Sequence, residues 1–209
     1  MVADPFELKR RKMVAEQLKA RGIQNERVLR VMAEIPRHLF VPPGEEDKAY
    51  DDHPLSIGSD QTISQPYIVA LMTEQLHLTP ESKVFEIGTG SGYQAAVLAR
   101  LAAEVYSIER IPELAESAAR RLESLGIRNV KIRVADGSQG WPEVAPFGGI
   151  IVTACAAKPP EPLLQQLADG GRMVIPLGEG LNQTLTRIER RGDSLDPRPI
   201  CGCVFVPLR

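Results

Sequence analysis

The most constraining feature of this chain is a regular alternation of short apolar runs and helical segments that begins at Lys83. Parallel strands need crossover connections, and right-handed helical crossovers supply them. The pattern therefore predicts an α/β fold, built as a doubly wound, mostly parallel sheet with helices on both faces. The predicted elements are strand 84–87, helix 91–103, strand 105–108, helix 112–125, strand 130–134, strand 150–153, helix 160–168 and strand 173–176.

The segment before this alternation is predicted to be helical, with one long loop. Helices are expected over 5–21 and 26–35, because Gly22 and Pro36 stop them and Asn25 can cap the second. A turn-rich stretch over 42–62 is expected to form a long ordered loop, and such loops in compact domains are usually functional. A further helix is predicted from Pro66 to about Leu76.

The end of the chain completes the predicted sheet. Strands over about 183–189 and 200–206 are close enough to pair as a hairpin and extend the sheet to seven strands. The 209 residues therefore predict a single domain with an N-terminal helical extension. Its predicted parts are helices and loop over 1–65, an α/β core over 66–180 and C-terminal strands over 181–209.

Composition and charge exclude several classes of protein. With 43% hydrophobic and 25% charged residues, the chain is not expected to be intrinsically disordered. A formal net charge of −2 gives no basic surplus for binding nucleic acid. The first ten residues have no apolar secretion signal, and no uncharged apolar stretch is long enough to cross a bilayer. Three cysteines form an odd set within apolar segments, so we expect reduced thiols, a cytoplasmic location and no membrane partner.

A glycine-rich turn follows the first strand of the alternation, in Phe85-Glu-Ile-Gly-Thr-Gly-Ser-Gly-Tyr. Glycines at such a turn allow unusual backbone angles and let a ligand approach the main chain. A dinucleotide fingerprint would need a third glycine where Tyr93 stands, which favours a nucleoside without a pyrophosphate. The plain alternative is a tight strand-to-helix turn with no ligand.

Two acidic residues follow the next two strands. Glu109 ends the strand at 105–108, and a carboxylate there can accept two hydrogen bonds from a ribose diol. Asp136 follows the strand at 130–134, where it could reach an adenine amino group. Glu109 could instead be a solvated acid at a helix start, and Asp136-Gly is also a turn signal. Together with the glycine turn, however, the two acids indicate an S-adenosylmethionine pocket.

Several motifs stand in order along most of the chain: Gln61-Thr-Ile-Ser-Gln-Pro-Tyr, Glu86-Ile-Gly-Thr-Gly-Ser-Gly-Tyr-Gln, Asp136-Gly-Ser-Gln-Gly-Trp, Ala145-Pro-Phe, Ile150-Ile-Val-Thr-Ala and Val204-Phe-Val-Pro-Leu. Together they resemble the protein-L-isoaspartate O-methyltransferase family of class I S-adenosylmethionine-dependent methyltransferases. The glycine motif is shared by many methyltransferases, whereas the Thr-Ile-Ser-Gln-Pro loop and the closing Val-Pro-Leu are more specific.

The resemblance implies methyl transfer from S-adenosylmethionine to the free α-carboxylate of L-isoaspartyl residues in damaged proteins, with S-adenosyl-L-homocysteine as the second product. In that family the ester collapses to a succinimide, whose hydrolysis returns some normal aspartate. The family's sheet is a Rossmann-like variant with its last two strands exchanged. Its active-site serine falls on Ser64. Its cofactor pocket falls on Thr62, Ile63, Gly88, Thr89, Gly90, Ser91, Gly92, Glu109, Asp136 and Gly137.

The residues are compatible with this chemistry. A carboxylate with a reference pKa of about 4 is already ionised at pH 7, so its methylation needs no general base. The histidines His38, His53 and His77 lack metal-ligand spacing, and no metal is expected. Ser64 would orient the acceptor carboxylate by a hydrogen bond, although its position also suits a plain helix N-cap.

Alternatives and departures from the family pattern stay open at this point. The chain could methylate a small-molecule carboxylate, or bind S-adenosylmethionine without transferring it. Gly148-Gly149 and Cys155 stand where the family usually has other residues, and Asp60 would repel an anionic substrate if it points inward. The expected partners are isoaspartyl proteins and peptides, not nucleic acid, and the expected state is a monomer.

Overall fold

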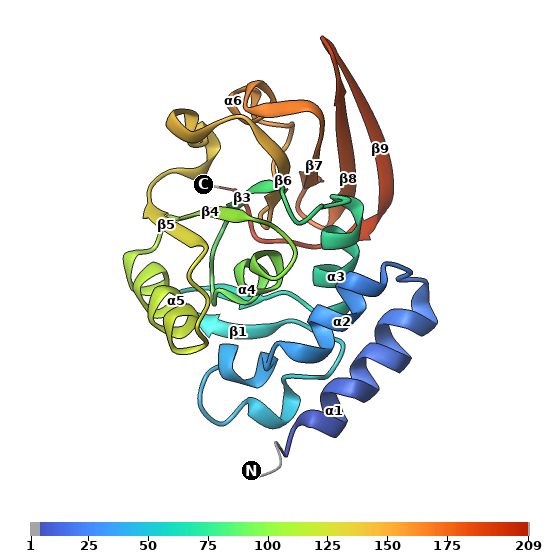
Figure 1. The fold of residues 1–209 in the computed structure, drawn as a ribbon, viewed down its shortest axis with the longest axis vertical. Helices are drawn as coiled ribbons and strands as arrows, with labels where there is room; N and C mark the ends of the chain where they lie inside the picture. Colours follow the sequence, from blue (N-terminus) through green and yellow to red (C-terminus); the bar gives the residue numbers. More distant parts are fainter. Residues whose placement is uncertain (1–4, 209) are drawn as a thin grey trace.

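The computed structural model describes residues 5–208 and has one large sheet with helices on both faces (Figure 1). Residues 1–4 and 209, which the sequence analysis assigns to the same domain, lie outside the described part. The sheet has seven strands in the order β5-β4-β3-β6-β7-β8-β9. Their bounds are β3 Lys83–Ile87, β4 Glu104–Glu109, β5 Val130–Val134, β6 Phe147–Val152, β7 Leu167–Glu179, β8 Asn182–Arg191 and β9 Ser194–Cys203.

The predicted doubly wound sheet is confirmed. Strands β5, β4, β3, β6 and β7 run parallel, whereas β8 and β9 are antiparallel and form the edge. Ile87 at the end of β3 pairs with Ile108 of β4 on one side and with Val152 of β6 on the other. This register brings the carboxyl ends of the central strands together at one edge, where doubly wound sheets bind ligands.

Three helices connect the parallel strands. They are α4 (Tyr93–Ala99), α5 (Pro112–Ser124) and α6 (Glu161–Gln165), and α4 and α6 are shorter than predicted. Every residue of α4 is buried, so this helix is determined by packing against its surroundings. In contrast, α5 is amphipathic and buries Ala115, Ala118 and Leu122.

The N-terminal helices form as predicted and pack at one end of the molecule, opposite the projecting β8–β9 hairpin (Figure 1). A continuous helical segment runs through α1 (Glu7–Lys12), η1 (Met13–Leu18) and η2 (Lys19–Arg21), and ends at Gly22, whose φ is +97°. The Asn25 side chain accepts hydrogen bonds from the backbone N–H groups of Arg27 and Val28 and so caps α2 (Glu26–Glu34). Helix α3 spans Pro66–Gln75.

Two predictions about the irregular regions were wrong. The stretch expected to be a loop contains a two-stranded hairpin, β1 (Leu55–Gly58) and β2 (Gln61–Ile63), after the short helices η3 (Arg37–Phe40) and η4 (Glu46–Lys48). These elements are too short to produce a detectable hydrophobic period. The last strand begins at Ser194 instead of about 200 and includes two prolines, which an edge strand tolerates.

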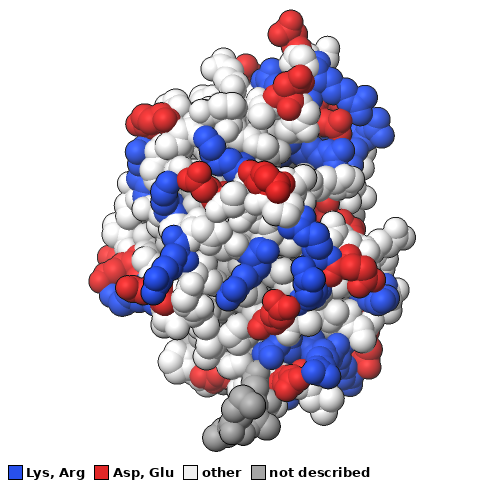
Figure 2. All heavy atoms as spheres, in the orientation of Figure 1, with Lys and Arg blue, Asp and Glu red and all other residues white. Residues whose placement is uncertain are grey.

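Surface charges are mixed on the face shown in Figure 2, where basic and acidic side chains are interspersed. This agrees with the near-zero net charge of the chain. Within residues 5–208, no helix combines the length and apolar character that a bilayer crossing requires.

Candidate functional site

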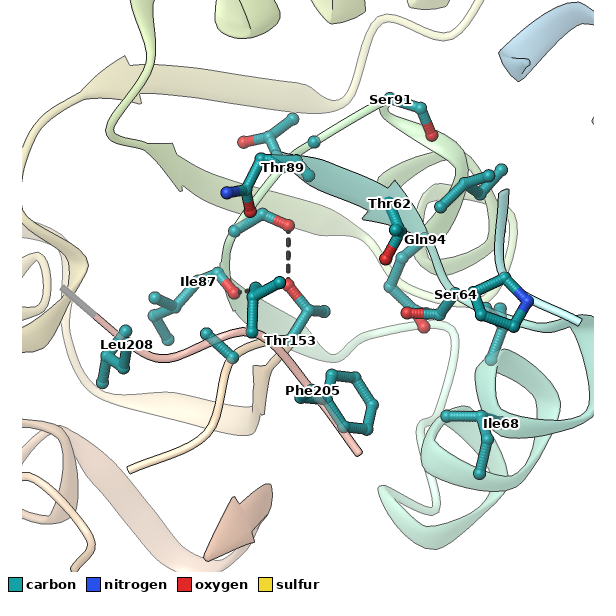
Figure 3. Close-up of a pocket in the computed structure, with 18 of the residues that line it drawn as sticks. Thr62, Ser64, Ile68, Ile87, Thr89, Ser91, Gln94, Thr153, Phe205 and Leu208 are labelled. Carbon is teal, nitrogen blue, oxygen red and sulfur yellow. Dashed lines mark hydrogen bonds between the residues drawn. The ribbon is translucent and has the colours of Figure 1, made fainter. Parts of the chain in front are cut away.

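A pocket of about 580 Å³ lies at the carboxyl ends of β3 and β4, a volume within the range of small-molecule sites. Three parts of the chain form its main walls: the sheet wall, with the glycine turn and strand ends over 87–91 and 108–111; the hairpin wall over 60–65; and the C-terminal wall over 202–208. In Figure 3, Thr62 and Ser64 lie on one side of the pocket, and Phe205 and Leu208 come from the C-terminal segment.

The glycine turn connects β3 to α4, as predicted. Gly88 has a φ of +94°, and a Cβ there would lie 2.3 Å from Thr153 Oγ1. The Thr153 hydroxyl in turn donates to the carbonyl oxygens of Ile87 and Gly88, at 2.9 Å each. Only glycine therefore fits at position 88, and the turn exposes main chain to the pocket.

Glu109 lies at the end of β4 and is only 6% exposed. One of its carboxylate oxygens accepts from the Gly90 backbone N–H at 2.8 Å, and the other accepts from Ile111 N–H at 2.9 Å. Each oxygen has two acceptor positions, so one on each remains for a ligand. The carboxylate thus stabilises the glycine turn and can also accept hydrogen bonds from a diol.

A buried polar chain lies directly behind the glycine turn. Thr89 Oγ1 lies 2.6 Å from Ser107 Oγ, and the Ser107 hydroxyl donates to Glu86 Oε2 at 2.5 Å. Burial raises the pKa of Glu86 from 4.5 to about 8, with the charge of Glu109 adding to the rise and the bond from Ser107 opposing it. Glu86 was not among the predicted site residues, although an acidic residue within an otherwise apolar strand can be recognised in the sequence.

Ser64 lies on the hairpin wall, just before α3. The N-cap of this helix is Gln65, so the plain N-cap alternative for Ser64 does not describe the structure. The backbone oxygen of Ser64 accepts a hydrogen bond from Arg37 Nη2 at 2.8 Å. Arg37 is fully buried and was also missed, because its partner lies 27 residues further along the chain.

The C-terminal wall is fixed by side-chain and backbone contacts. The Gln183 amide donates to Phe205 O at 3.0 Å and accepts from Phe205 N at 2.6 Å. Cys155 N donates to Val206 O, and Leu208 N donates to Cys155 O, both at 2.8 Å. Of the segment predicted as strand over about 200–206, residues 200–203 therefore belong to the edge strand β9, whereas 204–206 leave the sheet and line the pocket.

The structure brings nine of the eleven predicted site residues to the pocket wall. They are Thr62, Ile63, Ser64, Gly88, Thr89, Gly90, Ser91, Glu109 and Gly137. The other two, Gly92 and Asp136, are not among the lining residues. Gly92 precedes α4, and the exposed Asp136 caps a short turn by accepting from Ser138 N at 2.9 Å.

The departures from the family pattern have distinct surroundings. Asp60 lies in the pocket wall. Gly149 packs closely under Leu78, because a Cβ there would lie 2.9 Å from Leu78 Cδ2. Cys155 is buried, and its thiol lies 3.3 Å from the carbonyl oxygen of Gly178.

Comparison with known proteins gives a consistent result. The family model described as protein-L-isoaspartate(D-aspartate) O-methyltransferase matches residues 9–209. A relative from Syntrophobacter fumaroxidans, named protein-L-isoaspartate O-methyltransferase 1, is 53% identical over 97% of this chain and 95% of its own. A relative from Methanoculleus marisnigri, named protein-L-isoaspartate O-methyltransferase, is 50% identical over 100% of this chain and 94% of its own.

Solved structures resemble the fold throughout. One named protein-L-isoaspartate O-methyltransferase has a TM-score of 0.86 and 31% identity, and the match covers 94% of this chain and 65% of the other. A second structure, named as a protein-L-isoaspartate O-methyltransferase from Plasmodium falciparum in complex with S-adenosyl-L-homocysteine, has a TM-score of 0.84 and 27% identity. The match covers 96% of this chain and 98% of the other.

Proposed function

Because this chain belongs to the protein-L-isoaspartate(D-aspartate) O-methyltransferase family, we propose that its pocket joins a cofactor site on the sheet wall to an acceptor site beside Ser64. The protein is an S-adenosylmethionine-dependent methyltransferase that acts on the free α-carboxylate of L-isoaspartyl residues in damaged proteins and so initiates their repair. The observation that carries the site assignment is that the glycine turn, Glu109 and Ser64 line one pocket.

The sheet wall suits the nucleoside part of S-adenosylmethionine. Glu109 has acceptor positions left for the two ribose hydroxyls after its bonds to Gly90 and Ile111. The backbone at Gly88 through Ser91 would contact the rest of the molecule, and Thr62 and Ile63 would close over it. Asp136 would reach the adenine amino group from the rim, next to Gly137 in the wall.

When bound, the cofactor supplies a methyl group on a cationic sulfur, which makes the group electrophilic. The chain's own residues supply alignment and not proton transfer, because the acceptor carboxylate is already an anion at pH 7. Ser64 would donate a hydrogen bond from Oγ to the acceptor carboxylate and set its direction. The apolar side chains of the C-terminal segment, among them Phe205 and Leu208, would exclude water from the reacting atoms.

The remaining expectations about partners and location are part of the same proposal. Isoaspartyl proteins and peptides are the substrates, and we assign no nucleic-acid or membrane partner. The interspersed charges in Figure 2 and the balanced composition support this view. The three cysteines are free, which supports the cytoplasm as the location, and the domain would act as a monomer.

The direct test is to incubate the protein with methyl-labelled S-adenosylmethionine and two peptides that differ only in aspartate or isoaspartate at one position. Base-labile label on the isoaspartyl peptide alone is the expected result. Label on small free carboxylates, but on neither peptide, would support a small-molecule methyltransferase instead. Tight binding of the cofactor with no ester formed on any acceptor would support a sensor.

A further inference from the structure

Arg37 is the largest fully buried polar side chain in the described part of the molecule, and nothing in the proposed chemistry uses it. It begins the short helix η3 and has no exposed surface. It does not line the pocket, but it lies behind two residues that do, Ser64 and Tyr93. Burying a cation costs desolvation free energy, so the presence of an arginine at this position needs a physical explanation.

The guanidinium of Arg37 joins three separate parts of the chain. Nε donates to the carbonyl oxygen of Ala49 at 2.6 Å, and Nη2 donates to the carbonyl oxygen of Ser64 at 2.8 Å. The guanidinium carbon lies 4.7 Å from the centre of the Tyr93 ring, at the start of α4. The planar fork of arginine therefore fixes the two ends of segment 49–64 against the helix that follows the glycine turn.

The arginine is charged under ordinary conditions. Burial lowers its pKa to about 10, and the nearby Tyr93 and Tyr50 partly oppose this change. Its Nη1 finds no hydrogen-bond acceptor among residues 5–208. An apolar side chain of similar length would fill the same space without the desolvation cost of a buried charge, so packing alone does not account for Arg37.

We propose that Arg37 is a positioning residue, which fixes the backbone of Ser64 so that the serine hydroxyl meets the acceptor carboxylate. This inference rests on the proposed role of Ser64 and extends it by naming what holds the serine in place. Ser64 precedes α3 with Gln65 as N-cap, and that N-cap makes no side-chain capping bond. The bond from Arg37 is a direct hydrogen bond to the Ser64 backbone, between the buried Ile63 and Gln65, whose side chain donates to Asp52 Oδ2 at 3.1 Å.

The informative variant is Arg37→Lys, because lysine keeps the positive charge but not the fork that contacts both carbonyl groups. We expect kcat for the isoaspartyl peptide to fall about tenfold. The dissociation constant for S-adenosyl-L-homocysteine, measured by calorimetry, should change less than twofold, because lysine keeps the cation beside Tyr93 and the Arg37 hydrogen bonds go to Ala49 and Ser64 and not to the glycine turn or Glu109. Arg37→Met removes the charge as well, and its kcat should fall further.

A double-mutant cycle with Ser64→Ala separates positioning from a general structural effect. If Arg37 acts through the serine hydroxyl, the tenfold effect of Arg37→Lys should shrink to less than twofold once that hydroxyl is absent. An equal tenfold loss in both backgrounds would overturn the inference. If Arg37→Met does not fold, the Arg37→Lys cycle still decides.

A matched control is available in Arg27, whose guanidinium also donates to two backbone carbonyls, of Leu78 at 2.7 Å and Leu101 at 2.8 Å. Arg27→Lys should lower the melting temperature but leave kcat within twofold of the unmodified protein. An equal loss of kcat in both lysine variants would contradict a specific role for Arg37. Full turnover in Ser64→Ala alone would instead reject the assigned role of Ser64, so the two failures are distinguishable.

Discussion

The sheet wall and the hairpin wall of the pocket are held in place by different kinds of interaction. On the sheet wall, strand pairing itself places Gly88 and Glu109, because Ile87 and Ile108 are register partners. On the hairpin wall, the Ser64 backbone accepts a long-range bond from Arg37, and the C-terminal segment is held by Gln183 and by backbone bonds to Cys155. The sheet wall is thus a consequence of strand topology, whereas the other two walls are held by individual contacts between distant parts of the chain.

The two walls approach each other at Gly90, where the Ile57 side chain of β1 lies 3.5 Å from the position that a Cβ would take. A cofactor site held by strand pairing beside an acceptor site held by individual contacts suits a substrate that is part of a larger protein, since such an acceptor must enter and leave. The contrast predicts that substitutions on the sheet wall mainly affect stability and cofactor binding, and that substitutions on the hairpin wall mainly affect turnover.

The largest expected effect concerns the buried carboxyl group behind the sheet wall. Because the pKa of Glu86 is raised to about 8, the folded protein keeps a proton that the unfolded chain releases near pH 4.5. The folded state binds more protons in this window, so the free energy of unfolding should fall by a few kcal/mol as pH rises from about 5 to 8. Glu86→Gln does not titrate and should lose most of this decline.

Urea unfolding of both proteins at pH 5, 6.5 and 8 measures the difference. Glu81→Gln, which changes an exposed glutamate, is the control and should keep the decline of the unmodified protein. Parallel pH profiles for the unmodified protein and Glu86→Gln would show that the carboxyl group is not buried as described.

The next effect concerns cofactor binding. Glu109→Ala removes the carboxylate and leaves the N–H groups of Gly90 and Ile111 without their acceptor. Hydrogen bonds to a charged group contribute about 1.5–3 kcal/mol each, so the dissociation constant for S-adenosyl-L-homocysteine should rise at least about 100-fold. Calorimetry would measure it, with Glu113→Ala in the first turn of α5 as a control of equal charge. A rise below threefold would remove Glu109 from the cofactor site.

The same contrast explains what could be predicted from the sequence. Strand and helix periods predicted the sheet, and the residues after each strand end predicted the glycine turn and Glu109, because parallel strands bring those ends together. The hairpin at 55–63 was missed because its strands are too short to show a hydrophobic period, and the course of 204–208 was missed because contacts with distant residues such as Gln183 fix it.

The importance of Ser64 came from the family resemblance and not from any local pattern. Its backbone partner Arg37 is 27 positions away, and no period or spacing connects them. The buried Glu86 was missed for a different reason, because its motif was read for its glycines and not for the acid before them.

On the hairpin wall, Ser64→Ala should lower turnover roughly 10- to 100-fold, or about 1–3 kcal/mol, because it removes one hydrogen bond to an anion. Affinity for S-adenosyl-L-homocysteine and melting temperature should stay nearly unchanged. Steady-state methylation of an isoaspartyl peptide is the measurement, and Ser56→Ala in β1 is the control within the same hairpin. Unchanged turnover would leave the hairpin wall without a catalytic role.

The smallest effect concerns the turn of that hairpin. Ser59 and Asp60 form a two-residue connection between β1 and β2, with φ values of +53° and +55°. Two successive positive φ values define a turn in which glycine is favoured at the second position. Asp60→Gly should therefore raise stability by about 0.5–1 kcal/mol, or the melting temperature by about 1–4 °C.

Asp60→Asn separates the backbone effect from the charge. Asparagine tolerates the same backbone angles, so this variant should leave the melting temperature nearly unchanged. Because Asp60 lines the pocket, loss of its negative charge should lower KM for an isoaspartyl peptide about twofold through weaker repulsion of the acceptor carboxylate. A KM that falls equally in Asp60→Gly and Asp60→Asn, with a melting temperature that rises only in Asp60→Gly, would show that charge and turn geometry at position 60 act independently. A lower melting temperature in Asp60→Gly would instead mean that the aspartate side chain stabilises the turn.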